Sequence, residues 1–386
     1  MKTAIVYDRV NKWGGAERVL LALHKIFPEA PLYTSVYDEK RASWAKAFPK
    51  VYTSFLQKIP FAKNNHELFA PLMPIAFEQF NFDEYDLVIS VTSEAAKGII
   101  TKPHTFHLCY MLTPTRYLWS HYTTYLKGVT LKVLASPVIK YLRNWDKIAA
   151  TRPDKIIAIS TEVKKRIKKY YNRDSEIIFP PADSLASYHK NRLLRVSSKT
   201  SRRFLLDTQP YYLYVGRLVG YKKVDLLVNT FNDLNKKLVI VGTGYEVNSL
   251  KSKSRNNIKF LGEIDESELK RIYLKAKALI MPQEEDFGIV AVEAQSFGVP
   301  VIAYKKGGAC DTVIDGVTGV LFDEQNEASL TSAIEKFDKM SFNRRALIDN
   351  AKKFSFEIFQ KKLQRSLVRT FGGRRWRNKT LASFKK

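Results

Sequence analysis

Residues 276–304 carry the pattern that most restricts how this chain can fold. Residues 276–281 form an apolar run that predicts a buried strand, and residues 299–304 predict a second one. Between them, residues 288–297 have the composition of a helix, and Gly298 is a suitable C-terminal stop. A strand, an acidic loop, a helix and a strand in this order predict part of an open parallel sheet.

Two carboxylates bracket the start of the expected helix. Glu285 lies in the acidic loop, and Glu293 follows eight residues later, one to two turns into the helix. Ligands of open parallel sheets bind beyond the carboxyl ends of the strands, and a helix N-terminus suits a phosphate. The two carboxylates could therefore hold hydroxyl groups on either side of a diphosphate. The alternative is an acidic loop that caps an ordinary helix.

The rest of the chain repeats the alternation of strands and helices, which predicts doubly wound parallel sheets. Strands are expected at residues 4–7, 31–37, 86–90, 105–111, 156–159, 238–241, 258–262 and 320–322, and a basic helix at 161–171. Residues 211–217 are expected to start a second series of strands and helices. A length of 386 residues suggests two domains, and Pro180 and Pro181 mark a boundary. We expect an N-terminal domain at 1–185, a linker at 186–209, a second domain at 210–355, and a helix with a basic tail at 356–386.

Two further groups follow predicted strands. Gly14 and Gly15 lie between the first strand and the first helix, where a glycine pair lets a ligand approach the backbone closely. Many strand–helix turns carry glycine, so this pair alone is weak evidence. Arg217 and Lys222 come just after a strand of the second domain, where two cations could neutralise a diphosphate. Solvated surface charge is the alternative for either side chain.

Residues 51–82 are rich in aromatic residues, proline and lysine. We expect an irregular stretch here that either forms a groove for an acceptor or packs in the core against the sheet.

Together these motifs resemble the retaining glycosyltransferases of family four, which have the GT-B fold of two Rossmann-like, doubly wound domains facing across a cleft. The Glu-x7-Glu signature of that family matches Glu285 and Glu293. The resemblance implies that Glu285 contacts the donor sugar and Glu293 the ribose. It also implies an acceptor-side N-terminal domain, a donor-nucleotide C-terminal domain, and a last helix that packs back on the first domain.

The same resemblance assigns the phosphate contacts. The backbone of four consecutive residues, Phe287, Gly288, Ile289 and Val290, would hold the phosphates. Gly14 and Gly15 would contact the donor diphosphate. Arg217 and Lys222 match the Arg-x4-Lys element of the family. With Glu285, these two cations are the expected catalytic residues.

Three other segments resemble a branch of family four that contains mannosyltransferases of surface-polysaccharide assembly: 113–119, 142–146 and 152–160. This branch implies transfer of a hexose, mannose, from GDP-mannose to a glycan or lipid-linked acceptor, although no residue establishes the base or the sugar. We expect no cofactor and no metal, because no metal-ligand spacing is visible. A GT-B relative of another reaction type, a phosphorylase or a sugar-phosphate synthase, is the alternative enzyme.

One position departs from the family. Relatives commonly carry a histidine immediately before a Ser/Thr-Pro pair, near the reacting carbon of the donor sugar, and here Leu112 precedes Thr113 and Pro114. Three explanations compete: His104 or His107 supplies the missing contact, the donor lacks the hydroxyl that histidine would bind, or transfer is impaired.

The formal net charge of +26 indicates an anionic partner. Nucleic acid is the alternative function class, but no zinc-finger spacing or RNA-recognition signature is present, so we expect no nucleic acid partner. The basic helix at 164–169 and the tail at 374–386 favour peripheral attachment to an anionic membrane surface instead. With no signal peptide and no long apolar window, we expect a cytoplasmic protein on the inner face of the membrane.

Overall fold

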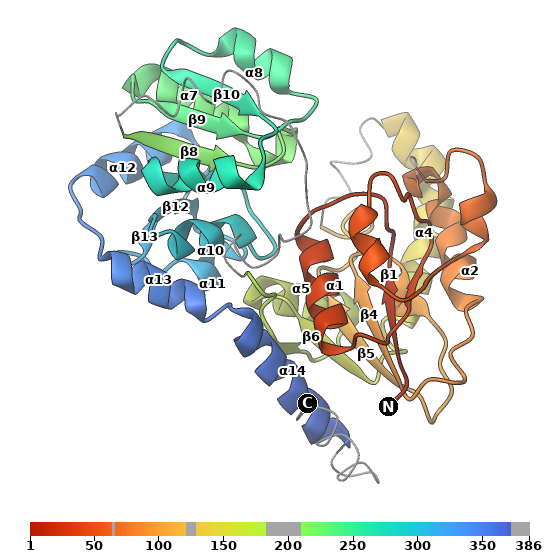
Figure 1. Ribbon diagram of the computed structural model, residues 1–386. Coiled ribbons are helices and arrows are strands. Elements are labelled where there is room, and N and C mark those ends of the chain that lie inside the picture. Colours follow the sequence, from red (N-terminus) through yellow and green to blue (C-terminus); the bar gives the residue numbers. More distant parts are fainter. Residues whose placement is uncertain (64–65, 121–128, 183–209, 372–386) are drawn as a thin grey trace. The chain divides into compact units, whose positions relative to one another are not determined.

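The computed structural model of the chain folds into two compact units (Figure 1). It describes residues 1–63, 66–120, 129–182 and 210–371. Unit 1 comprises Met1–Pro181 and Phe359–Lys386, and unit 2 comprises Ala182–Ile358. The last helix, α14 (Phe356–Phe371), begins in unit 2 and continues in unit 1. The expected linker at 186–209 and the basic C-terminal tail lie outside the described residues.

Unit 1 is built on seven parallel strands in the order β3-β2-β1-β4-β5-β6-β7. Its strands are β1 (Thr3–Tyr7), β2 (Leu32–Thr34), β3 (Val51–Thr53), β4 (Leu87–Thr92), β5 (Phe106–Met111), β6 (Lys155–Ala158) and β7 (Glu176–Ile177). Its helices include α1 (Gly15–Ile26), α2 (Met73–Glu78), α4 (Val129–Ala149) and α5 (Thr161–Tyr171), with 3-10 turns η1 (Ser43–Ala47), η2 (Phe55–Lys58), η3 (His66–Leu72) and η4 (Ala96–Gly98). The chain winds outward from β1 and then returns to β4, so the strand order reverses between these two strands.

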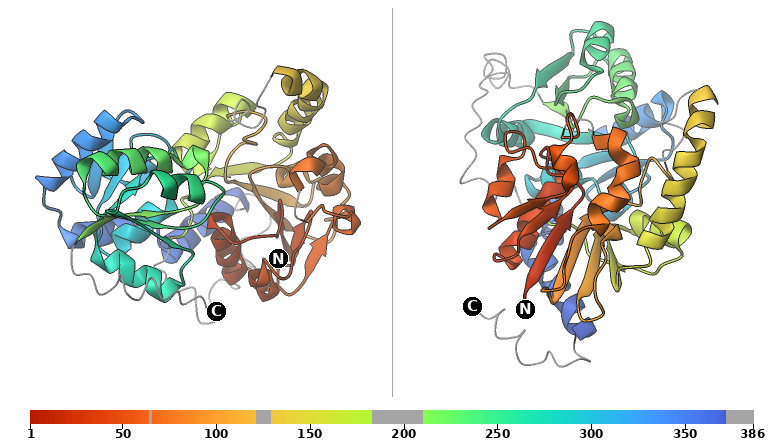
Figure 2. Two further views of the ribbon diagram at one scale, coloured as in Figure 1. Left: turned by 90° about the horizontal axis from the view of Figure 1, so that it is seen from above. Right: turned by 90° about the vertical axis from the view of Figure 1, so that its right-hand side faces the viewer.

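Unit 2 repeats this plan with six parallel strands in the order β10-β9-β8-β11-β12-β13. Its strands are β8 (Tyr211–Val215), β9 (Leu238–Val241), β10 (Ile258–Gly262), β11 (Ala276–Met281), β12 (Val301–Tyr304) and β13 (Gly319–Phe322). Its helical elements include η5 (Gly220–Lys222), α7 (Val224–Leu234), α8 (Val247–Lys253), α9 (Glu266–Lys275), α10 (Ile289–Ser296), α11 (Ala309–Thr312), α12 (Glu327–Asp338) and α13 (Arg344–Lys352). The order reverses between β8 and β11. Helices lie on both faces of each sheet (Figures 1 and 2), which confirms the predicted doubly wound architecture.

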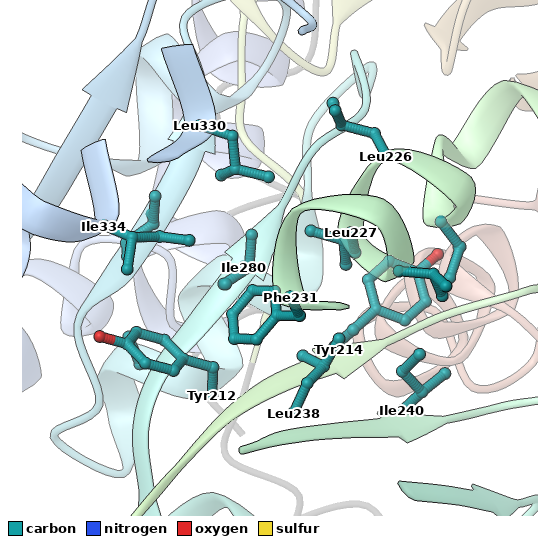
Figure 3. Close-up of a cluster of buried hydrophobic side chains, with 14 of the residues drawn as sticks. Tyr212, Tyr214, Leu226, Leu227, Phe231, Leu238, Ile240, Ile280, Leu330 and Ile334 are labelled. Atoms are coloured by element: carbon teal, nitrogen blue, oxygen red, sulfur yellow. The ribbon is translucent and has the colours of Figure 1, made fainter. Parts of the chain in front are cut away.

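The core of unit 2 follows from the alternation of side chains along its strands. Tyr212 and Tyr214 of β8 point to one face, where they pack with α7 and α12, and Figure 3 shows this cluster. Tyr211 and Leu213 of the same strand point to the opposite face, where they pack with residues of α9 and α10. Because both faces are covered, the strands are continuous apolar runs, as is typical of parallel sheets.

Part of the stretch 51–82 packs in the core of unit 1, which is one of the two outcomes that its composition left open. It is less irregular than expected, because it contains β3, η2, η3 and α2. Leu56, Phe77 and Phe82 are at most 1% exposed and belong to one buried cluster. Packing therefore accounts for part of its apolar character, whereas Phe61, Leu68 and Ile75 of the same stretch are 78%, 77% and 54% exposed.

Most element boundaries agree with the sequence-based expectation, and β9, β10, β11 and α5 agree to the residue. The second strand is shorter than expected, since β2 ends at Thr34. The side chain of Gln57 accepts from the Tyr37 N–H at 2.8 Å and donates to the Tyr37 carbonyl at 3.1 Å. Tyr37 still forms an isolated parallel bridge with Val10, so the pairing is interrupted after Thr34 and does not continue as a regular strand.

The described part of α14 packs on unit 1 through a hydrogen bond and a ring contact. Ser366 Oγ donates to Glu176 Oε2 at 2.7 Å, and the ring of Phe359 lies 5.9 Å from that of Tyr110. Across the described ranges, no helix combines the length and hydrophobicity that a membrane span requires.

Candidate functional site

The loop that follows β8 carries the two predicted cations of unit 2. Arg217 lies near its start and is exposed, while Lys222 lies in the 3-10 turn η5 and is partly buried. The turn ends at Lys223, whose φ of 54° reverses the backbone before α7 begins. Tyr221 lies between the two cations in sequence, and its ring contacts both of them. Its ring centroid is 5.8 Å from Arg217 Cζ and 5.3 Å from Lys222 Nζ.

The loop that follows β11 brings Glu285 to Lys222. The two side chains form an ion pair in which Lys222 is 12% exposed and Glu285 is 18% exposed. Gln283 Nε2 donates a second hydrogen bond to the same carboxylate oxygen at 2.8 Å. Because Lys222 is ordered and largely buried by this pair, it is not the solvated surface charge that its sequence alone allowed.

Two glycines after β12 let the Glu285 loop lie against a neighbouring turn. Gly308 N–H donates to the Glu285 carbonyl at 2.7 Å, and Gly307 forms a parallel bridge with Glu285. A Cβ on Gly307 would lie 2.1 Å from the Glu285 carbonyl oxygen, and Gly307 has a φ of +65°. A Cβ on Gly308 would lie 2.3 Å from Phe287 Cα. Only glycine fits at either position without moving the loop.

Helix α10 starts directly after this loop. Gly288 precedes it with a φ of +80° and provides no side-chain cap, so the first N–H groups of the helix have no side-chain acceptor from this position. Ile289 and Val290 form the beginning of the first turn. Glu293 is 2% exposed on the inner face of α10, and Tyr273 donates to its Oε2 at 3.3 Å.

The strand order explains why these groups meet. Strands β8 and β11 are hydrogen-bonded neighbours, and the order of the sheet reverses between them. In open parallel sheets this reversal creates the crevice in which ligands bind. Arg217, Lys222 and Glu285 follow these two strands, so they share the carboxyl edge of the sheet at this point.

Gly14 and Gly15 occupy the equivalent place in unit 1, after β1 and at the start of α1. Among the described residues, a Cβ on Gly15 would meet nothing within 4 Å outside its own helix and its chain neighbours, so the space beside it is open. A Cβ on Gly14 would lie 3.1 Å from Glu17 Oε2. Glu17 is 1% exposed and accepts from the Tyr7 hydroxyl at 3.0 Å. Burial raises the pKa of the Glu17 carboxyl.

The segments 113–119 and 142–146 meet around one buried carboxylate of unit 1. Asp146 accepts hydrogen bonds from Thr115 Oγ1, Trp119 Nε1 and the Tyr171 hydroxyl, each at 2.7 Å. Lys97 Nζ lies 2.6 Å from Asp146 Oδ1, and both side chains are 1% exposed. These residues therefore form a buried network that fixes the segments after β4 and β5.

The structure separates Leu112 from both histidines that could replace the missing side chain. His107 is fully buried on β5, where its Nε2 lies 2.8 Å from Ser90 Oγ. His104 precedes β5, and its Nε2 lies 2.9 Å from the Asp83 carbonyl oxygen. Leu112 follows the opposite end of the strand and donates its N–H to the Thr92 carbonyl at 2.8 Å. Neither histidine is placed to act beside Leu112.

Among the residues whose side chains contact the predicted side chains of the unit 2 site, Tyr221, Gln283 and Tyr273 were not predicted from the sequence. Tyr221 lies inside the Arg-x4-Lys element, and Gln283 lies two residues before Glu285, so closeness to the motifs was the available signal. Tyr273 is twenty residues from Glu293 and carried no such signal. Within the described ranges, no group of three or more His, Cys, Asp or Glu side chains is arranged to hold a metal ion.

Comparison with known proteins relates the second unit to glycosyltransferases. Residues 197–354 match the family model described as Glycosyl transferases group 1. An uncharacterized glycosyltransferase of Methanocaldococcus jannaschii is 28% identical over 220 residues, which are 55% of this chain and 58% of that protein. The capsular polysaccharide biosynthesis glycosyltransferase CapM of Staphylococcus aureus is 26% identical over 268 residues, 64% of this chain and 69% of that protein.

A third relative has a named donor. The GDP-mannose-dependent alpha-(1-6)-phosphatidylinositol monomannoside mannosyltransferase of Mycolicibacterium smegmatis is 30% identical over 155 residues, 36% of this chain and 41% of that protein. The match to the Methanocaldococcus jannaschii protein and the match to this mannosyltransferase each span less than two thirds of the relative's length.

The similarity in fold to solved structures covers more of the chain than the family model does. The crystal structure of HepE of Anabaena in complex with UDP has a TM-score of 0.68 at 18% identity, covering 95% of this chain and 99% of that chain. The two doubly wound units and this likeness over nearly the whole chain identify the fold as GT-B, as the sequence predicted.

Proposed function

We propose that the protein is a retaining glycosyltransferase that moves a hexose from a nucleoside-diphosphate sugar to a glycan or lipid-linked acceptor. The observation that carries this proposal is the Lys222–Glu285 ion pair, with Arg217 nearby, at the point where the strand order of unit 2 reverses. Two cations, a carboxylate and a helix N-terminus at one sheet edge suit a ligand with both phosphates and hydroxyls.

In this mechanism the leaving group is the nucleoside diphosphate. As the bond between the anomeric carbon and the phosphate oxygen breaks, negative charge develops on the diphosphate. Arg217, Lys222 and the N–H groups at the start of α10 are preorganised to stabilise that charge. The acceptor oxygen bonds to the anomeric carbon on the same face, and its proton passes to the departing phosphate. Glu285 would hold the donor sugar and Glu293 the ribose.

The positive charge in this proposal comes from the protein itself, so we assign no metal or cofactor. Gly14 and Gly15 are assigned to the donor diphosphate, because the backbone beside Gly15 is open. These assignments rest on the family resemblance of the Gly-Gly turn.

We propose GDP-mannose as the donor and synthesis of a surface polysaccharide as the context. Support comes from the segments that resemble the mannosyltransferase branch, from the GDP-mannose-dependent relative and from the capsular polysaccharide relative. The UDP complex of HepE makes uridine donors the necessary comparison.

We further propose that the protein works on the cytoplasmic side of a membrane and attaches to it peripherally. The net charge of +26 supports this, as do the exposed lysines Lys164, Lys165, Lys168 and Lys169 on one basic helix. Basic side chains gain about 1 kcal/mol each near an anionic surface. Sedimentation with vesicles that contain anionic lipid should be strong and reversed by salt. Equal sedimentation with neutral vesicles would contradict the proposal.

The enzymatic proposal is tested by measuring transfer and hydrolysis with a panel of GDP- and UDP-sugars. Arg217→Ala and Lys222→Ala should each lower the transfer rate by about a hundredfold or more, the effect expected when a group that stabilises a leaving anion is lost. Lys270→Ala, which removes an exposed lysine of α9, is the matched control and should leave the rate unchanged. Near-normal rates for both site variants would overturn the assignment.

The same kind of assay distinguishes the proposed glycosyltransferase from the two alternative functions. Phosphorolysis of a glycan, or transfer only to a soluble sugar phosphate, would identify a GT-B enzyme of another reaction type. Salt-sensitive binding of nucleic acid without any sugar-nucleotide turnover would instead favour the nucleic-acid class.

A further inference from the structure

Three tyrosines hold the loop that carries Arg217 and Lys222. Tyr214, at the end of β8, donates its hydroxyl hydrogen to the Arg217 carbonyl at 3.2 Å. Tyr245, in the turn after β9, accepts from the Gly220 N–H at 3.1 Å. These two fix the backbone of the loop, while the third, Tyr221, contacts the cationic side chains themselves.

Tyr221 touches both cations at once. Its hydroxyl accepts a hydrogen bond from Arg217 Nη2, and its ring lies 5.8 Å from Arg217 Cζ. Lys222 Nζ lies 5.3 Å from the same ring, while it also pairs with Glu285. A single aromatic side chain therefore links the exposed cation to the largely buried one.

The physical consequence is that Tyr221 holds the two positively charged side chains in position before a ligand binds. Arg217 is exposed, and a long exposed side chain loses rotamer entropy when a ligand orders it. Two neighbouring cations also repel each other. An aromatic ring attracts each cation through its quadrupole, so Tyr221 offsets both effects before the ligand arrives. Cations already in place stabilise a developing anion better than cations that must reorganise.

We propose that Tyr221 is a positioning residue that holds Arg217 and Lys222 for the diphosphate of the donor. This inference rests on the proposed function, because it needs a ligand whose phosphates meet these two cations. It predicts an effect that depends on the number of phosphates: Tyr221 should matter for diphosphates and much less for monophosphates.

The experiment measures binding of GDP, UDP, GMP and UMP by calorimetry, together with kcat for the sugar nucleotide that the panel selects. Tyr221→Leu removes the ring and the hydroxyl, and it should weaken the preferred diphosphate about tenfold, the size expected for losing two cation–π contacts. The matching monophosphate should change less than about twofold. Tyr221→Phe keeps the ring, so it should recover most of the affinity, and kcat should follow the same order.

Combining substitutions tests whether Tyr221 acts through the cations. In an Arg217→Ala/Lys222→Ala background, Tyr221→Leu should have no further effect on diphosphate affinity, because residues that act through one another are not additive. The same loss in both backgrounds, or an equal loss for mono- and diphosphates, would make Tyr221 merely structural and overturn the inference. An unchanged melting temperature of Tyr221→Leu is the control for folding.

Different results would refute the role of Tyr221 and the proposed function. If the wild-type protein binds a diphosphate and transfers sugar while Tyr221→Leu behaves like wild type, only the role of Tyr221 is refuted. If the wild-type protein neither binds any diphosphate nor turns over any sugar nucleotide, the proposed function is refuted, and the role of Tyr221 with it.

Discussion

Replacing Lys97 with methionine tests whether the buried network of unit 1 holds its segments in place. Lys97 pairs with Asp146 at 2.6 Å, and it also donates to Thr115 Oγ1 at 3.1 Å. Both members of the pair are 1% exposed. Methionine is of similar length and apolar, so Lys97→Met removes the charge with little change in packing.

The magnitude follows from the geometry of the pair. Two unit charges 2.6 Å apart attract by about 6 kcal/mol at an effective dielectric constant of roughly 20. Part of that attraction is offset by the desolvation of both ions, and removing one partner of a buried pair typically costs about 3–5 kcal/mol. Asp146 keeps three hydrogen-bond donors at 2.7 Å after the change, so we expect the lower end, about 3 kcal/mol.

The assay is native-state hydrogen exchange of the β4 and β5 amides, because it reports the stability of unit 1 separately from unit 2. Lys102→Met is the matched control: its pair with Asp83 is exposed, at 58% and 44%, and should contribute less than about 1 kcal/mol. Adding Asp146→Asn to Lys97→Met should restore part of the loss, since no unpaired charge then remains buried. Equal effects of the two lysine substitutions would refute the reasoning.

Two further predictions concern the site and the pH dependence of stability. Glu293→Ala should weaken binding of the nucleoside diphosphate by about tenfold or more, whereas Glu285→Ala should mainly slow turnover; calorimetry that gave the reverse would exchange their roles. Burial, followed by the charges of Arg152 and Arg173, lowers the pKa of His107 to about 3, compared with about 6.5 for an unfolded histidine. The folded chain therefore binds fewer protons than the unfolded chain between these values, so His107 reduces stability as the pH falls below about 6.5, by up to about 1.4 kcal/mol per pH unit. The unfolding free energy of His107→Gln should fall less steeply from pH 6.5 to 5 than that of wild type, and parallel curves would contradict this.

Much of the fold was predictable because its signals are local. The apolar run of β11, the helix composition of α10 and Gly298 after it lie within one stretch of sequence, and each has a physical reason to form its element. Gly298 has a φ of +77°, which an ordinary residue rarely adopts. The strand β3 was missed because its three residues are only half-buried and carry no clear alternation.

The contacts among the candidate site residues were not predictable from the sequence. The Lys222–Glu285 pair joins residues 63 positions apart, and only the pairing of β8 with β11 brings them together. The contact of Tyr273 with Glu293 likewise depends on how α9 and α10 pack on the same face of the sheet. Side-chain geometry of this kind depends on tertiary packing, which periodicity does not encode.

Leu112 is a position where the chain departs from the family it resembles, and the structure removes one of the three explanations, a substitute histidine. His107 is buried against Ser90, and His104 lies in the turn before β5, whereas Leu112 follows the other end of that strand. An apolar side chain cannot bind a hydroxyl through a hydrogen bond, so either the donor lacks that hydroxyl or transfer is slow. With the mannosyl donor proposed above, slow transfer is the expected reason, whereas a deoxy-sugar donor would make the missing hydroxyl the reason; Leu112→His assayed with mannosyl, glucosyl and deoxy-sugar donors decides between them. A gain confined to the hydroxylated donors supports a changed donor, and a gain with every donor supports impaired catalysis. No change with any donor would mean that Leu112 does not contact the sugar.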